Sequence, residues 1–80
     1  MTPPPFKIRH VDMYAWAVDF EDETGSSWAS AEKPMDGTVD VIVWHEQWYD
    51  HPKGAAYVAS QFKSWAAQEG IRYKLANGRY

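Results

Sequence analysis

The sequence predicts an α+β fold: a mostly antiparallel four- or five-stranded sheet with one α-helix packed across one face. Three observations lead to this prediction. Residues 38–49 are rich in β-branched and aromatic side chains, as a buried strand requires. Residues 54–69 place apolar side chains at helical spacing. Shorter stretches alternate apolar and polar residues between turns that contain glycine or proline.

The chain of 80 residues is predicted to form one domain, 1–80, with a flexible proline-rich lead over 1–5. Five Trp, five Tyr and three Phe supply the buried area that so short a chain needs. Because there is no cysteine, disulfides and thiolate metal sites are excluded. No apolar run is long enough to cross a membrane, so we expect no membrane association. A cytoplasmic location is the default expectation.

The first half of the chain reads as two hairpins. Residues 6–9 alternate apolar and basic side chains and predict a strand, and the break at 10–12 indicates a turn or bulge. Residues 13–20 are apolar on both faces, which predicts a strand inside the sheet. The polar stretch 21–26 is typical of a hairpin loop, and its partner strand follows at 26–31.

The second half contains the long strand and the helix. Within 38–49, Val39, Val41 and Val43 form the row predicted to meet the helix. Pro52 ends the strand and suits the first turn of a helix, with Asp50 or His51 as its cap. The apolar stripe of that helix consists of Ala55, Val58, Phe62, Trp65 and Ala66.

The end of the chain is predicted to terminate the helix and to form a last strand. Gly70 is the expected left-handed residue after the helix. Residues 71–75 alternate apolar and basic side chains as a strand does, and Asn77-Gly78 is typical of a type I′ turn.

The sheet face away from the helix is predicted to be aromatic. Alternation places four rings on it: Tyr14, Trp16, Trp44 and Trp48. Since no second helix is available, either the sheet curls around these rings or they are partly exposed. We expect partial exposure, and an exposed aromatic patch of that size marks a contact surface.

Charge is segregated along the chain, whose net charge is −3. Nearly all the carboxylates lie within residues 11–50, where Lys33 is the only Lys or Arg, whereas 51–80 is basic. Phosphates require Lys and Arg, so the acidic middle disfavours direct nucleic-acid binding and favours a protein partner with a basic surface. The alternative is that folding brings the two blocks together and they neutralise each other.

The sequence contains no convincing catalytic motif. The stretch 45–51 resembles the zinc-protease motif His-Glu-x-x-His, but Tyr49 stands where the second His is needed. A metal site from His45 and His51 with Asp50 or Glu46 remains an alternative to the simpler helix-cap interpretation. No serine has a Gly-x-Ser-x-Gly context, and no glycine-rich phosphate loop occurs. We therefore predict that the protein is not an enzyme and needs no metal or cofactor.

Two functions remain. In the first, the protein is an inhibitor or adaptor that engages a basic, nucleic-acid-binding partner through acidic loops and exposed Trp residues. The predicted partner-binding residues are Asp19, Glu21, Asp22, Glu23, Trp16, Trp44, Glu46 and Trp48. In the second, it binds single-stranded nucleic acid through a stacking platform. That platform consists of Trp16, Trp44 and Trp48. The basic residues that would follow the phosphate backbone of the nucleic acid are Lys53, Lys63, Arg72, Lys74 and Arg79.

The acidic hairpin 19–23 and the Trp row give the chain a profile that resembles the small inhibitors of phages and mobile elements, of which anti-CRISPR proteins are the best-known group. The resemblance covers the whole chain in profile and rests on no motif. It implies stoichiometric binding to a Cas subunit or complex in the bacterial host cell, which would block DNA access or nuclease recruitment. The sequence leaves the oligomeric state and the partner's identity open.

Overall fold

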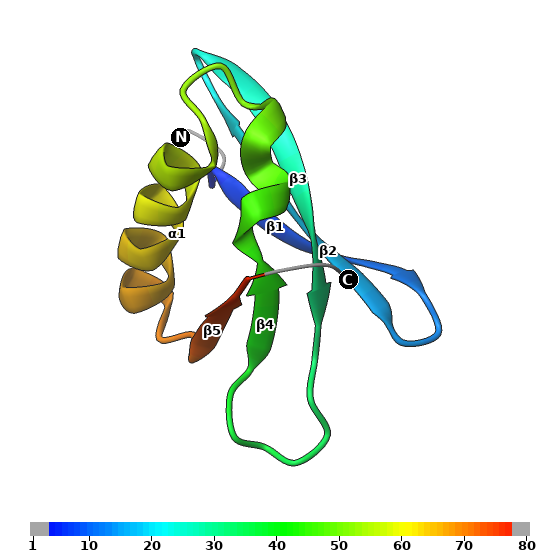
Figure 1. Ribbon diagram of the computed structural model, residues 1–80. Coiled ribbons are helices and arrows are strands. Elements are labelled where there is room, and N and C mark those ends of the chain that lie inside the picture. The colour runs from blue at the N-terminus through cyan, green and yellow to red at the C-terminus, as the bar shows by residue number, and fades with distance from the viewer. Residues whose placement is uncertain (1–3, 78–80) are drawn as a thin grey trace.

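The computed structural model describes residues 4–77 and has five strands, one α-helix and one 3-10 helix (Figure 1). The α+β class is confirmed. The elements are β1 (Phe6–Asp12), β2 (Ala15–Asp22), β3 (Gly25–Glu32), β4 (Val41–Trp44), η1 (His45–Asp50), α1 (Ala55–Glu69) and β5 (Tyr73–Ala76). Residues 1–3 of the predicted lead and Gly78 of the predicted final turn lie outside the described residues.

The sheet is mixed, with the strand order β1-β2-β3-β4-β5. Successive strands from β1 to β4 pair antiparallel, whereas β5 pairs parallel to β4. The expectation of a mostly antiparallel sheet therefore needs correction. The reason is the connection: α1 carries the chain back along the sheet, and a crossover through a helix returns the next strand in the parallel sense.

The first hairpin differs from its prediction at the turn. Met13 and Tyr14 form that turn, so β2 begins at Ala15. Of the turn or bulge predicted at 10–12, the structure has the bulge, because β1 continues to Asp12 and the register shifts between His10 and Asp12. The hairpin loop predicted for residues 21–26 consists of Glu23 and Thr24 alone, because β2 and β3 remain paired up to Asp22 and Gly25.

The long strand predicted for 38–49 is wrong beyond Trp44. Only Val41–Trp44 is extended, and His45–Asp50 forms η1. Had the strand continued, Trp48 would share a face with Trp44, opposite Val41 and Val43. The 3-10 turn changes this parity, so that Trp48 enters the buried cluster that contains both valines.

The helix occupies Ala55–Glu69, close to the predicted span. Gly54 is its N-cap, with φ +88° and no side-chain cap, so the prediction of Asp50 or His51 as the cap is wrong. Both of those residues are used by η1, which ends at Asp50 and has His51 as its C-cap. Gly70 adopts the predicted left-handed conformation.

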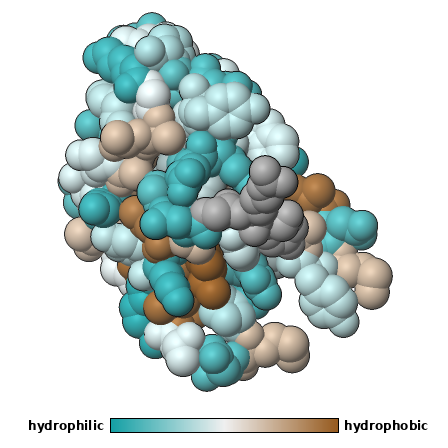
Figure 2. Space-filling view, viewed as in Figure 1, coloured by the Kyte–Doolittle hydropathy of each residue, from teal (hydrophilic) through white to brown (hydrophobic). Residues whose placement is uncertain are grey.

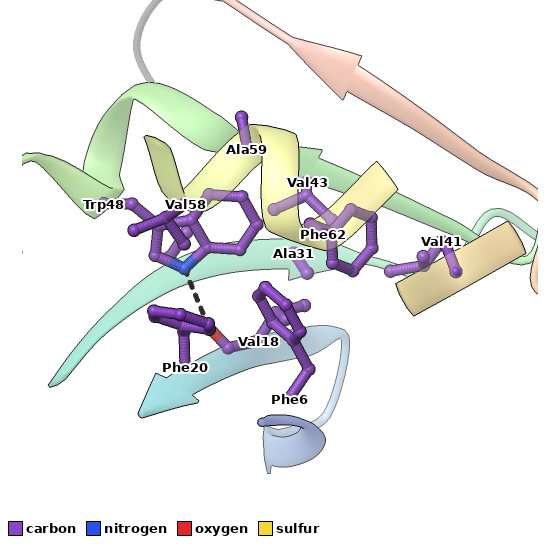
Figure 3. Packing of buried hydrophobic residues seen from close by; sticks show 12 residues of the cluster. Phe6, Val18, Phe20, Ala31, Val41, Val43, Trp48, Val58, Ala59 and Phe62 are labelled. Atoms are coloured by element: carbon purple, nitrogen blue, oxygen red, sulfur yellow. Dashed lines mark hydrogen bonds between the residues drawn. The ribbon is translucent and has the colours of Figure 1, made fainter. Parts of the chain in front are cut away.

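Aromatic rings fill the core between the sheet and α1 (Figure 3). Phe62 lies 5.3 Å from Phe6, 5.5 Å from Trp48 and 5.3 Å from Tyr73, measured between ring centroids. The Trp48 indole N–H donates a 3.1 Å hydrogen bond to the Val18 carbonyl, so this large ring is buried without an unsatisfied donor. The core therefore joins β1, β2, η1, α1 and β5.

The predicted aromatic face does not form. Trp16 alternates with Val18 and Phe20 and packs against the buried cluster, Trp48 is inside that cluster, and Tyr14 is in the hairpin turn. Trp44, which is half-buried, alternates with Val43 and so is directed to the other side of β4.

We expect Phe62→Ala to lower the free energy of unfolding by about 3–5 kcal/mol, because it leaves a cavity among four aromatic rings. Trp65→Ala, at a half-buried position of the same helix, should cost less. Urea denaturation measures both. A Phe62→Ala protein within half a kilocalorie of the wild type would contradict this description of the core.

Candidate functional site

The predicted acidic residues gather on the β2–β3 hairpin but differ in their surroundings. Asp19 is paired with Arg9 of β1 through two hydrogen bonds of 2.8 and 3.0 Å. Glu21 and Glu23 are exposed, and neither side chain has an ion pair within residues 4–77. Asp22 points inward. On the hairpin, Glu21 and Glu23 are therefore exposed, whereas Asp19 and Asp22 are engaged in contacts within the protein.

Asp22 is the centre of a partly buried polar cluster. Its Oδ1 accepts hydrogen bonds from the Thr24 hydroxyl at 2.6 Å, the Gly25 backbone N–H at 3.1 Å and His51 Nε2 at 3.1 Å. Its Oδ2 accepts a 2.7 Å hydrogen bond from the Tyr57 hydroxyl. These donors, the Thr24 hydroxyl first among them, hold the pKa of Asp22 well below its usual range, although partial burial acts in the opposite direction.

The contacts of His51, which is only 2% exposed, show which of its ring nitrogens carries the hydrogen. The Lys53 backbone N–H donates to His51 Nδ1 at 3.1 Å, so the ring hydrogen is on Nε2 and points to Asp22. The hydrogen bond to Asp22 also raises the pKa of Tyr57. The cluster thus joins the hairpin to the start of α1.

Gly25 brings the hairpin tip against the loop between η1 and α1, as Figure 1 shows. A Cβ at Gly25 would lie 2.6 Å from Pro52 Cδ, closer than two carbon atoms can approach. Only glycine therefore allows this contact. Together with the Asp22 cluster, it holds the end of η1 beside the hairpin.

The predicted Trp residues do not share one surface. Trp16 is half-buried, with the His10 ring centroid 4.7 Å away and Lys33 Nζ 4.3 Å above its ring. Trp48 is fully buried and is a core residue, so its assignment as a contact residue is corrected. Glu46 is exposed on η1, and Trp44 lies at the end of β4.

Two exposed rings that the sequence analysis did not select lie beside the hairpin instead. Trp28 of β3 is 54% exposed and Tyr49 of η1 is 71% exposed. One signal for Trp28 was available, because its alternate neighbours Ser26 and Ser30 are polar whereas Ala29 and Ala31 face the core. Tyr49 had no such signal, since its orientation depends on the 3-10 turn.

These rings border two adjoining pockets. The first, of about 250 Å³, is lined by Trp28, Gln47, Tyr49 and Asp50. The second, of about 380 Å³, shares Trp28 and Asp50 with the first and adds Asp19, Phe20, Glu21, Ser26 and Ser27. We call the first the Trp28–Tyr49 pocket. Its wall is fixed by Gln47, whose Oε1 accepts a 2.8 Å hydrogen bond from the Ser30 backbone N–H.

The two histidines proposed as metal ligands do not converge. His45, at the start of η1, contacts the Asn77 side chain, whereas His51, after its end, contacts Asp22. Within residues 4–77 no three His, Asp or Glu side chains gather as a metal site would require.

Comparison with protein-family models, with curated proteins and with solved structures finds no match for the chain. In the part of the chain that the structure describes, no helix has the length and apolar character needed to cross a membrane.

We expect Asp22→Asn to destabilise the protein at pH 6 and to lose this effect in acid. The native pKa of Asp22 is below its unfolded value, so its stabilisation is complete above about pH 4 and is lost as the pH falls from there towards the native pKa. Urea denaturation from pH 2.5 to 6.5 should show the difference from wild type narrowing below pH 4.

Glu23→Gln is the matched control, since it removes the same charge from the same hairpin without breaking these hydrogen bonds. If Asp22→Asn is as stable as Glu23→Gln at pH 6, the cluster does not stabilise the fold.

Proposed function

We propose that this protein is a non-enzymatic protein-binding module, an inhibitor or adaptor that engages a partner with a basic surface. The observation that carries the proposal is the meeting of exposed carboxylates and exposed aromatic rings at one end of the molecule. Glu21 and Asp50 flank Trp28, and Tyr49 borders the adjoining pocket. Aromatic anchors within a polar rim are typical of protein interfaces.

The charge pattern supports a basic partner. Within residues 4–77, the ion pairs Arg9–Asp19 and Arg72–Asp40 join the acidic middle of the chain to its basic ends. Glu21 and Asp50 have no ion pair there, so neutralisation among these residues is partial. Among the described residues, no Lys or Arg lines either of the two pockets. Figure 2, viewed as in Figure 1, shows mostly hydrophilic residues over the end that carries the hairpin tip and η1.

A nucleic-acid-binding protein is the partner class that best fits this acidic end. Its basic groove is built for phosphates, and carboxylates held on a small rigid domain compete for the same Lys and Arg side chains. Inhibition of a Cas subunit or complex, as the resemblance to anti-CRISPR proteins implies, is a particular case of this function.

The absence of catalysis is part of the proposal and is supported by the state of His51. Both of its ring nitrogens are engaged inside the protein, Nδ1 with the Lys53 N–H and Nε2 with Asp22. The imidazole has no free nitrogen with which to move a substrate proton.

The alternative, a platform for single-stranded nucleic acid, has less support. Trp48 is buried and cannot stack on a base, and Arg72 is paired with Asp40. Lys53 lies over the Tyr57 ring, 4.8 Å from its centroid. Arg79 lies outside the described residues.

The test compares two double variants with the same change in net charge. Glu21→Lys/Glu23→Lys reverses the hairpin tip and leaves Asp22 in place, while Glu32→Lys/Glu69→Lys reverses two exposed carboxylates elsewhere. A partner is first captured from a bacterial lysate on the immobilised wild-type protein, identified by mass spectrometry and purified. We expect the hairpin variant to lower its association rate roughly tenfold at low salt, and the control to change it little.

Both variants should remain folded, because exposed substitutions usually change stability by no more than about 0.5 kcal/mol. Equal losses in the two variants would contradict a site on the hairpin. Tight binding of the wild-type protein to a 12-nucleotide single-stranded oligonucleotide at physiological salt would favour the alternative function.

A further inference from the structure

We propose that the Trp28–Tyr49 pocket binds an arginine side chain of the partner. This inference rests on the proposed function and specifies which group of the basic partner is recognised, and where. The pocket combines two exposed aromatic rings with a carboxylate and is about 250 Å³ in volume, large enough for one side chain.

The two rings are available for a ligand. Neither Trp28 nor Tyr49 makes a ring contact or a side-chain hydrogen bond within residues 4–77. Elsewhere within residues 4–77 two half-buried aromatic rings already hold a cation, since Lys33 lies over Trp16 and Lys53 over Tyr57. The rings of the pocket have no such internal cation, although the face of an aromatic ring attracts one.

The charge of the pocket selects a cationic ligand over an apolar one. Asp50 lines both pockets and Glu21 lines the second, and neither carboxylate has an ion pair among the described residues. The third carboxylate there, Asp19, is neutralised by Arg9. An apolar side chain would remove water from the free carboxylates without replacing its hydrogen bonds, which is costly.

Arginine fits this arrangement better than lysine. A guanidinium is planar, so it can stack on an indole or phenol ring while its edge donates two parallel hydrogen bonds to a carboxylate. An ammonium group is more strongly hydrated and cannot donate in this bidentate way. Asp50 lines the same pocket as both rings, which allows stacking and bidentate binding to occur together.

The rigid surroundings of the pocket favour binding without a large rearrangement. Trp28 is on the central strand β3, and Tyr49 and Asp50 precede His51, which the hydrogen bond to Asp22 holds in place. Gln47 is fixed by its hydrogen bond to Ser30. A preformed site loses less conformational entropy when the ligand binds.

The test uses short peptides, because the partner is unidentified. The probe is acetyl-Gly-Arg-Gly-Arg-Gly-amide, and matched peptides replace both arginines by citrulline, an uncharged isostere, or by lysine. ¹⁵N-labelled protein is titrated with each peptide, and the indole N–H signals are assigned with single Trp→Phe variants. We expect a saturable shift of the Trp28 indole with the arginine peptide, none with the citrulline peptide, and weaker binding of the lysine peptide.

Variants locate the site. Trp28→Ala and Asp50→Asn should each raise the Kd for the arginine peptide roughly fivefold to tenfold. Tyr14→Ala removes an exposed ring from the other hairpin and Glu69→Gln removes an exposed carboxylate from α1, so both should leave the Kd unchanged. Trp28→Phe keeps an aromatic face and should retain part of the affinity, which separates loss of the ring from loss of the fold.

Three results would overturn the proposal. Absence of a saturable shift, or equal shifts with the citrulline peptide, would show that the pocket does not bind a guanidinium. Equal affinity for the lysine peptide would show that only positive charge is recognised. The proposed function would survive these results if the Glu21→Lys/Glu23→Lys protein still lost its partner selectively. If the arginine peptide binds as expected but the Glu21→Lys/Glu23→Lys protein binds the partner normally, arginine binding by the pocket is supported. Glu21 and Glu23 then do not belong to the interface.

Discussion

The burial of Trp48 is the constraint on which the rest of this structure depends. Its ring lies among Phe6 and Phe62, and its indole N–H is satisfied by the Val18 carbonyl on a neighbouring element. To reach that position the chain has to leave the extended conformation after Trp44, because an uninterrupted strand would direct Trp48 to the opposite face. Thus one aromatic residue shortens β4 and creates η1.

The exposed site follows from the same turn. Since Trp48 points inward, Tyr49 and Asp50 at the end of η1 remain on the surface, beside Trp28 of β3. The hydrogen bond between His51 and Asp22 then ties the end of η1 to the β2–β3 hairpin. A hydrophobic contact and a polar contact therefore act together: burial of Trp48 orients the segment, and the His51–Asp22 hydrogen bond holds its end beside the hairpin.

Much of the fold could be predicted because it depends on local chemistry. The apolar spacing over 55–69 identifies α1, Gly70 identifies its end, and the break at 10–12 identifies the bulge. The candidate site was harder to predict from the sequence. The acidic hairpin was recognised from composition, but composition does not distinguish exposed Glu21 from Asp22, whose carboxylate accepts hydrogen bonds from residues 2 to 35 positions away in the chain.

The sequence by itself determined the α+β class, the helix, the early strands and the acidic character of the hairpin, because each of these follows from neighbouring residues and their spacing. Only the tertiary structure decided that Trp48 is buried and that Tyr49 is exposed. Trp28 and Trp48 are the same residue type in stretches that are both predicted as strands, and their exposed fractions of 54% and 0% reflect which side of the backbone faces the buried cluster. That choice depends on contacts between segments distant in the chain, and local propensity contains no information about them.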